Sequence, residues 1–268
     1  MYRFLLTRQW VILTLVGLVL IPTMVRLGFW QLHRHEHRVA QNHLIGDSLK
    51  APAVPVTELT SPGREVRRDD TWRTVRATGT YDTAHEVVVR QRTGSDEQSI
   101  GYFVLTPLTL PGGKSVLVNR GWIPAGTDLT RYPEVPAAPS GEVTVTGRLK
   151  ADETPGNSGI KDKQGLPDRQ VSLINSERQA ERLSRPVLGG YIELTSSSPK
   201  GGKRPEPVAA PDHSSIGPHM AYAIQWWLFA AGVPVGWFVL VRRERKDRAA
   251  ESAPAAAQEK VPAAAGAE

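Results

Sequence analysis

The 268-residue chain contains no cysteine. It therefore forms no disulfide bond, and it has no thiolate with which to bind a metal ion. This absence excludes a copper chaperone of the Cys-x-x-x-Cys kind.

The central part of the chain also lacks concentrated positive charge. Residues 30–218 hold 24 lysines and arginines against 22 acidic residues, whereas the whole chain has a net charge of +6. A nucleic-acid partner requires a basic face on the folded domain, and no such cluster is evident. The excess positive charge lies mostly at the flanks, where anionic lipid attracts it. The composition thus predicts contact with membrane lipid and no nucleic-acid partner.

Two long apolar runs stand out from an otherwise soluble composition. Residues 9–27 are interrupted only by Pro22 and Arg26, and residues 220–241 contain no charged residue. A helix needs roughly 20 apolar residues to cross a bilayer. The pattern predicts transmembrane helices over residues 9–29 and 219–241.

The first run shares one feature with a signal peptide, because Arg3 and Arg8 precede it. However, its apolar part is longer than the roughly 7–15 residues of a signal core, and no small-x-small cleavage site follows. The bulky and charged sequence LGFWQLHRH occupies that place. An uncleaved membrane helix is the better interpretation.

Basic residues near the helix ends predict the orientation. The sequence RRERKDR follows the second run, and Arg3 and Arg8 precede the first, so both termini are expected in the cytoplasm of a cell-membrane protein. The predicted order is a cytoplasmic segment (1–8), a membrane helix (9–29), an extracytoplasmic domain (30–218), a second membrane helix (219–241) and a basic, then disordered, cytoplasmic tail (242–268).

The middle of the chain shows the alternation and Gly/Pro punctuation of short strands. Pro111-Gly112-Gly113 predicts a hairpin, SERQAERL at 176–183 predicts one short helix with Ser176 as its N-cap, and 196–218 reads as a polar tether. We expect a mainly-β extracytoplasmic domain, β-barrel-like or a curled antiparallel sheet. The expected strands span residues 71–81, 85–92, 102–110, 115–124, 142–150 and 190–196.

Residues 30–38, WQLHRHEHR, contain His33, His35 and His37 together with Glu36. His33-x-x-Glu36-His37 matches the H-x-x-E-H pattern of some zinc peptidases. A peptidase would also need a further protein ligand and a large supporting domain, which a small β-fold does not supply. The alternatives are a solvated helix end and a contribution to haem or copper handling.

Three stretches in order resemble one family. They are LGFWQLHR (27–34), the block from GYFVLTPL to VLVNRGWIP (101–124) and HMAYAIQWWLFA (219–230). The combination resembles the Surfeit locus family of cytochrome c oxidase assembly factors, over about residues 9–241. The one departure noted is His37, where the family often has tryptophan. The matching residues are Gly28, Trp30, Gln31, Leu32, Arg34, Gly79, Tyr81, Gly101, Tyr102, Pro107, Asn119 to Pro124, His219, Tyr222, Ala223, Gln225 and Trp226.

The resemblance implies a membrane-bound assembly factor and not an enzyme. Its expected partners are cytochrome c oxidase subunit I and other oxidase assembly factors, and its expected cofactor is transiently held haem a. The family's candidate haem ligand corresponds to His219. A membrane-tethered envelope ligand sensor is the alternative outside oxidase assembly.

From the residues themselves, each site has a structural alternative. His219 would also serve as a wet interfacial histidine, while Trp226 and Trp227 could flank a macrocycle or simply mark the membrane interface. Arg120, next to Trp122, could hold a propionate or make a cation–π contact at a strand corner. Gly232-x-x-x-Gly236 predicts close helix packing, against Gly17 of the first membrane helix.

Overall fold

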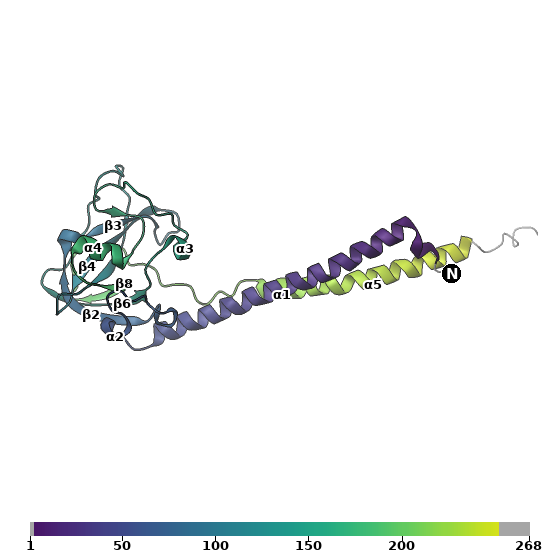
Figure 1. The fold of residues 1–268 in the computed structure, drawn as a ribbon, viewed down its shortest axis with the longest axis horizontal. Helices are drawn as coiled ribbons and strands as arrows, with labels where there is room; N and C mark the ends of the chain where they lie inside the picture. Colours follow the sequence, from purple (N-terminus) through teal and green to yellow (C-terminus); the bar gives the residue numbers. More distant parts are fainter. Residues whose placement is uncertain (1–2, 252–268) are drawn as a thin grey trace, which may run out of the picture. The chain divides into compact units, whose positions relative to one another are not determined.

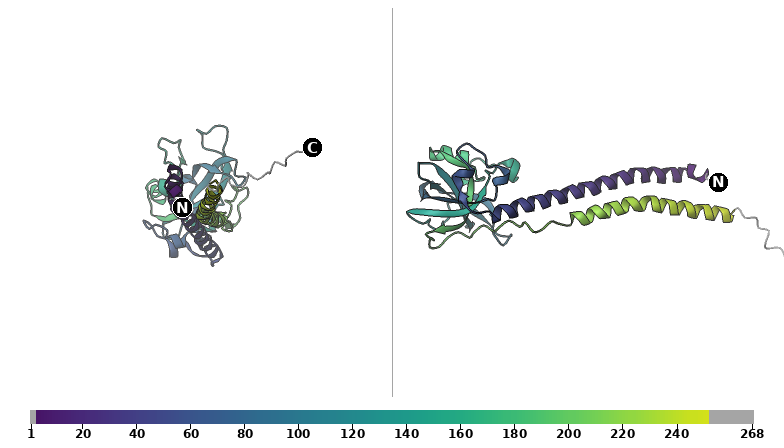
Figure 2. Two further views of the ribbon diagram at one scale, coloured as in Figure 1. Left: turned by 90° about the vertical axis from the view of Figure 1, so that its right-hand side faces the viewer. Right: turned by 90° about the horizontal axis from the view of Figure 1, so that it is seen from below.

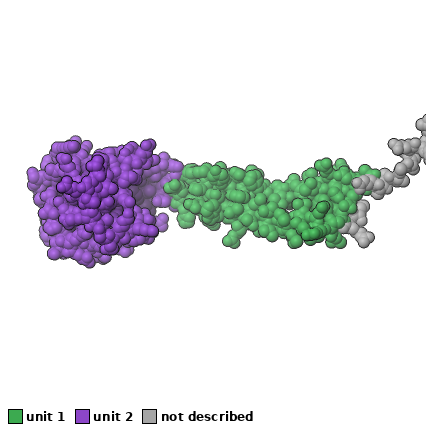
Figure 3. All heavy atoms as spheres, turned by 90° about the horizontal axis from the view of Figure 1, so that it is seen from above, with its two compact units in different colours: residues 1–39, 216–268 green, residues 40–215 purple. Residues whose placement is uncertain are grey.

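The structure is a computed structural model, and it describes residues 3–251 of the chain. It divides into two compact units, Met1–Val39 with Ile216–Glu268 and Ala40–Ser215 (Figure 3). The expected disorder of the tail at 252–268 lies outside the described residues. Each unit is described in turn.

The first unit is built on two long helices, α1 (Arg8–Lys50) and α5 (His219–Glu251), with the 3-10 turn η1 (Arg3–Leu6) before α1 (Figure 1). Both helices are long and apolar enough to cross a bilayer. This confirms two candidate membrane helices, one on each side of the sheet domain in sequence.

Helix α1 continues far beyond residue 29, through the histidine cluster to Lys50. Between residues 29 and 45 the sequence has no glycine or proline, which disfavour helix, and it includes the helix formers Leu, Gln and Arg twice each. Pro52 follows shortly after the end, where proline disfavours helix in the residue before it. The juxtamembrane helix is therefore longer than the short continuation predicted from the sequence.

The two helices run antiparallel (Figure 2). Side-chain contacts join them along a seam. Trp237 Nε1 donates a hydrogen bond to Thr14 Oγ1 at 3.1 Å. A Cβ on Gly17 would lie 3.5 Å from Val233 Cγ1. Small and hydroxyl side chains on α1 thus let α5 approach, as is typical of membrane helices.

The prediction that Gly232 and Gly236 pack against Gly17 is wrong. A Cβ on either glycine would meet nothing within 4 Å. Val233 and Trp237 occupy the seam, and residues 232 and 236 are each one position earlier, which turns them about 100° around the helix. The two glycines therefore make no close contact with α1, and they border a groove between the helices that Gly17 also lines.

The second unit is a β-barrel. Within residues 3–251, five strands pair in a ring, because β2 pairs with β6 along one side and with β4 at its end. The ring consists of β2 (Thr74–Tyr81), β6 (Glu142–Lys150), β8 (Val187–Ser198), β5 (Ser115–Pro124) and β4 (Ile100–Thr109).

Shorter elements extend and cover this ring. Strand β3 (Val87–Thr93) pairs with β4. Two strands of two residues each extend the sheet: one pairs with β2 and the other with β3. The remaining elements are β1 (Val54–Pro55), α2 (Val56–Leu59), η2 (Arg68–Asp70), η3 (Thr83–His85), α3 (Pro155–Ser158), β7 (Gln170–Val171) and α4 (Ser176–Leu183).

The barrel-like sheet with one short helix is confirmed, and β5, β6 and α4 have the predicted bounds. The PGG hairpin joins β4 to β5, with Leu110 N donating to Lys114 O at 2.8 Å. The sheet is not purely antiparallel, since β5 and β8 run parallel. The long connection through β6 and α4 makes that crossover feasible.

The N-cap of α4 is Asn175 and not Ser176. Asn175 Oδ1 accepts a hydrogen bond from Arg178 N at 3.1 Å. Ser176 is the first helical residue, and its hydroxyl donates to Asp152 Oδ2 at 2.5 Å. Both side chains are cap formers by type, and the acceptor on Asp152 decides which one caps.

The barrel interior is filled by inward-facing aliphatic side chains. Strand β2 alternates buried and exposed positions from Val75 to Tyr81, as a half-buried strand should. Val75, Val145, Leu149 and Ile192 are fully buried in one cluster. Burial of each such side chain contributes roughly 1.5–3 kcal/mol.

Closure of the barrel depends on Gly79. A Cβ at this buried position would lie 2.1 Å from Thr109 O, which belongs to the β4 backbone. We predict that Gly79→Ala lowers the free energy of unfolding of the β unit by about 1–3 kcal/mol or more, because a backbone carbonyl cannot move aside cheaply. Urea unfolding of the full chain in detergent, followed by circular dichroism, measures this.

Gly126→Ala is the matched control, since a Cβ there meets nothing within 4 Å. It should change stability by less than about 0.5 kcal/mol. Equal effects of the two substitutions would contradict the closure assigned to Gly79.

Candidate functional site

His219 begins α5, directly after Pro218, and its ring contacts α1. Its Nδ1 lies 3.0 Å from Gln31 Oε1. A carbonyl oxygen only accepts hydrogen bonds, so Nδ1 carries the proton and donates it. With the proton on Nδ1, a neutral imidazole has its lone pair on Nε2, which is the form of imidazole that binds metals.

The approach of the helices near His219 depends on Gly28. A Cβ on Gly28 would lie 2.2 Å from Trp227 Nε1, so the indole rests directly on the α1 backbone. The Phe29 ring meets the same indole edge-on, with centroids 5.5 Å apart. Ala223, one turn before Trp227, is fully buried. Gln31 is one turn after Gly28, which brings it level with His219.

The two predicted tryptophans have different surroundings. Trp227 packs between the two helices, against Gly28 of α1. Trp226 is half-buried, and its ring meets the Phe229 ring edge-on with centroids 6.2 Å apart. Trp226 follows His219 by seven residues and thus shares its face of α5. Only Trp226 remains available to flank a ligand on that face.

Of the three clustered histidines, His35 is the one placed toward the seam. It lies one turn after Gln31 on the same face of α1, and its Nδ1 is buried without a hydrogen-bond partner among residues 3–251. His33, Glu36 and His37 are exposed. Within the part of the chain that the structure describes, no group of three or more His, Asp or Glu side chains is placed to hold a metal ion. The zinc-peptidase interpretation thus lacks its further protein ligand there.

Arg120 lies in the barrel, in the other unit from His219. Its guanidinium is buried, donating from Nη1 to Glu86 Oε2 and from Nη2 to Pro136 O, both at 2.8 Å. The cation–π contact expected at this corner is made with Tyr81, at 5.7 Å, and not with Trp122. The structure does not bring Arg120 together with His219 and Trp226 within one unit.

Glu86 is the centre of this network. Its carboxylate also accepts hydrogen bonds from Thr106 Oγ1 at 2.7 Å and Tyr132 OH at 3.0 Å. Burial raises the pKa of Tyr81 to about 12, and burial together with the Glu86 charge raises the pKa of Tyr132. The buried Glu86 carboxylate thus accepts hydrogen bonds from two hydroxyl groups in addition to Arg120, as a buried polar group requires.

Sequence reasoning assigned no role to Glu86, to Gln31 or to His35 individually. A signal for the last two was present, because Gly28, Gln31 and His35 recur at i, i+3 and i+7 on one helical face. Glu86 had no such signal, since its partners come from strands far along the chain.

The geometry defines a class of protein: two candidate membrane helices flank a small β-barrel, and a histidine at the start of the second helix is oriented by the first. A family model for the SURF1 family matches residues 18–231. The chain belongs to the SURF1 family, whose members are generally cytochrome oxidase assembly factors.

Similar proteins carry the same family name. An uncharacterised SURF1-like protein of Mycobacterium bovis is 31% identical over 259 residues, covering 94% of this chain and 92% of that protein. One from Mycobacterium tuberculosis matches to the same extent. A SURF1-like protein of Rickettsia bellii is 26% identical over 108 residues, covering 40% of this chain and 42% of that protein.

Lys150 generates a pH prediction for the barrel. Its ammonium lies 3.2 Å from the centroid of the Trp72 ring, and burial lowers its pKa from 10.5 to about 8. Between these two pH values the unfolded chain holds more protons than the folded one. The free energy of unfolding should therefore rise with pH above about 8, by at most about 1.4 kcal/mol per pH unit.

Urea unfolding between pH 7.5 and about 9.5, below ordinary tyrosine ionisation, tests this. Lys150→Met should abolish the rise, whereas Lys161→Met, at an exposed lysine, should keep it. A rise that persists unchanged in Lys150→Met would refute the assignment.

Proposed function

We propose that this protein is a cytochrome c oxidase assembly factor that holds haem a through His219 while subunit I is matured. In this proposal it is a cell-membrane protein with both termini in the cytoplasm, and the barrel faces the extracytoplasmic side. It acts as a cofactor chaperone with oxidase subunits and other assembly factors as partners, and it is not an enzyme.

One observation carries the haem part of the proposal: Gln31 Oε1 lies 3.0 Å from His219 Nδ1, and a hydrogen bond donated there leaves Nε2 free to bind a metal ion. Bound there, haem a would supply an iron that coordinates neutral imidazole, and His219 would hold it. When a histidine binds a metal through one ring nitrogen, a hydrogen bond from the other ring nitrogen fixes the tautomer of the ring and raises its basicity.

The side chains around His219 also suit a flat, largely apolar group. Tyr222 and Trp30 are about half exposed, and Trp226 is half-buried. All three lie on the two helices near the His219–Gln31 bond. Arg120 is not part of the proposed site, because its guanidinium donates to Glu86 and Pro136 within the barrel.

The orientation rests on basic residues at the end of α5. Arg242, Arg243 and Arg245 follow the apolar run, and the run itself has no charge. Such residues are retained on the cytoplasmic side, which supports a cytoplasmic carboxyl terminus.

Purification from cells that make haem a tests the proposal. The wild-type chain should show a Soret band, and His219→Ala should remove most of it, while His213→Ala, at an exposed histidine, should retain it. A colourless wild-type preparation that still co-purifies an oxidase subunit would end the haem part and leave a scaffold that stabilises a subunit intermediate.

Gln31 variants test the orienting bond. Gln31→Leu should weaken haem binding about 10-fold, within the 10–100-fold range for loss of the hydrogen-bond partner of a metal-binding histidine. Gln31→Glu should retain binding and lower the reduction potential of the haem, because a carboxylate raises the basicity of the imidazole. Spectrophotometric haem titration and potentiometry measure the two effects. Gln41→Leu, at an exposed position of α1, should match wild type. Identical affinities and potentials in all variants would contradict the role of Gln31.

A further inference from the structure

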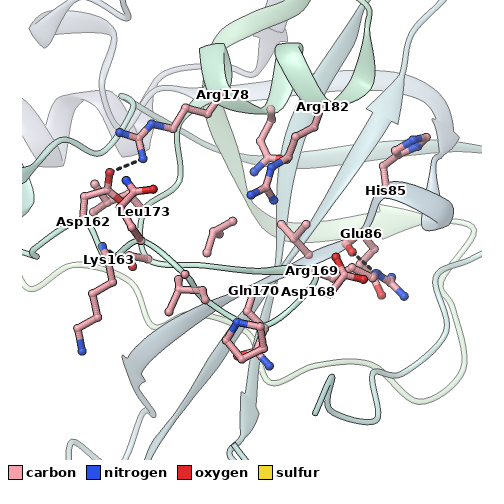
Figure 4. A pocket seen from close by; sticks show the side chains of 18 of the residues that line it. His85, Glu86, Asp162, Lys163, Asp168, Arg169, Gln170, Leu173, Arg178 and Arg182 are labelled. Atoms are coloured by element: carbon pink, nitrogen blue, oxygen red, sulfur yellow. Dashed lines mark hydrogen bonds and ion pairs between the residues drawn. The ribbon is translucent and has the colours of Figure 1, made fainter. Parts of the chain in front are cut away.

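The β unit contains a polar cavity that is separate from the helix seam. Its volume is about 520 Å³, and its walls are residues 84–87, the loop at 162–173 and α4 (Figure 4). Pockets that bind small ligands in proteins have about this size. Nothing in the proposed haem role uses it.

The loop wall of this cavity is held in place. Arg178 on α4 forms an ion pair with Asp162 across the cavity, and Lys163 N donates to Ser172 Oγ at 3.2 Å. Arg169 has a positive φ of 57°, its Nε donates to Glu86 O at 2.9 Å, and its guanidinium stacks 4.0 Å from the Tyr132 ring. A non-glycine residue held in this conformation is typical of functional sites.

The free charges of the cavity are mainly positive. The carboxylates of Glu86 and Asp162 are paired with Arg120 and Arg178. The charged ends of Arg182 and Lys163 have no partner within residues 3–251, and both residues are exposed. Figure 4 shows the Arg182 side chain extending from α4 toward the loop, and the Lys163 side chain extending from the loop away from Arg182. The exposed Asp168 is the opposing charge. The unpaired charges that line the cavity are therefore mainly positive, and they favour the binding of an anion.

The walls between these charges are apolar or amide. Val87, Leu166 and Leu173 line the cavity, and the buried Gln179 contributes from α4. A single small inorganic anion would leave most of such a volume, and all of its aliphatic wall, unused. The lining suits carboxylates that are carried on short hydrocarbon stems.

We propose that this cavity binds a ligand with aliphatic-stem carboxylates, held by Arg182 from α4 and by the exposed Lys163 at the edge of the cavity. Two sources present this chemistry: a free organic dicarboxylate, and the glutamate side chains of an acidic peptide segment of a partner protein. The site is independent of His219, so it stands whether or not the protein binds haem.

Calorimetric titration of the full chain in detergent at low salt tests the proposal. Glutarate and acetyl-Leu-Glu-Leu-Glu-amide are the two probes, and pentane-1,5-diol and the glutamine form of the peptide are their uncharged counterparts. At least one charged probe should bind, neither uncharged counterpart should, and binding should weaken as salt is raised. If glutarate binds more tightly than the peptide, the ligand is a free dicarboxylate. If the peptide binds more tightly than glutarate, the ligand is an acidic segment of a partner protein.

The variants locate the binding. Arg182→Gln and Lys163→Gln should each weaken it about 10-fold or more, as expected for loss of a charge-assisted hydrogen bond. Arg182→Lys should retain most of it, and circular dichroism checks that each variant is folded. Lys161→Gln, an exposed lysine of the same loop that does not line the cavity, is the matched control.

Two results would overturn the proposal. One is the absence of heat with both charged probes at millimolar concentration. The other is binding that Arg182→Gln and Lys163→Gln weaken no more than Lys161→Gln does.

Discussion

The contact of the Trp227 indole with the α1 backbone at Gly28 is the constraint on which the helix unit depends. Any larger residue at 28 would displace the indole, and the first turn of α5 would then separate from Gln31. The hydrogen bond that determines the His219 tautomer is therefore a consequence of a missing Cβ one helical turn away. Glycine matters here for packing and not for its backbone freedom.

The barrel buries several charged side chains inside a small fold. Arg120–Glu86, Arg92–Glu153 and Arg148–Glu193 are buried ion pairs, and each arginine also donates to at least one backbone carbonyl. Breaking such a pair leaves an uncompensated charge, which is far costlier than never burying it. Arg92 and Arg120 join strands to Glu153 and Glu86 in connecting segments, and Arg148 joins β8 to the backbone at Val208. These contacts hold the connecting segments against the sheet.

The sequence predicted most of the architecture because its signals are local. Apolar runs, alternation and the PGG turn located both long helices, β5, β6 and the hairpin. Long-range pairing was not predictable in this way: the parallel β5–β8 ladder, the β2–β4 closure and the Glu86 network join residues far apart in the chain. The Gly232/Gly236 prediction failed because a motif marks small residues without saying which helical face is buried. His219 was predicted as a site residue and Gln31 only as a residue that matches the family, because their hydrogen bond joins positions 188 residues apart in the chain.

In the two proposals, the helices hold a cofactor and the barrel binds a second ligand. The claim that most needs testing is that the chain serves oxidase assembly. The reduced-minus-oxidised absorption spectrum of membranes from a strain lacking this gene addresses it directly. The account predicts a diminished haem a signal relative to the b-type haems, restored by the wild-type chain. A normal oxidase spectrum in the deletion strain would contradict it and favour an envelope ligand sensor.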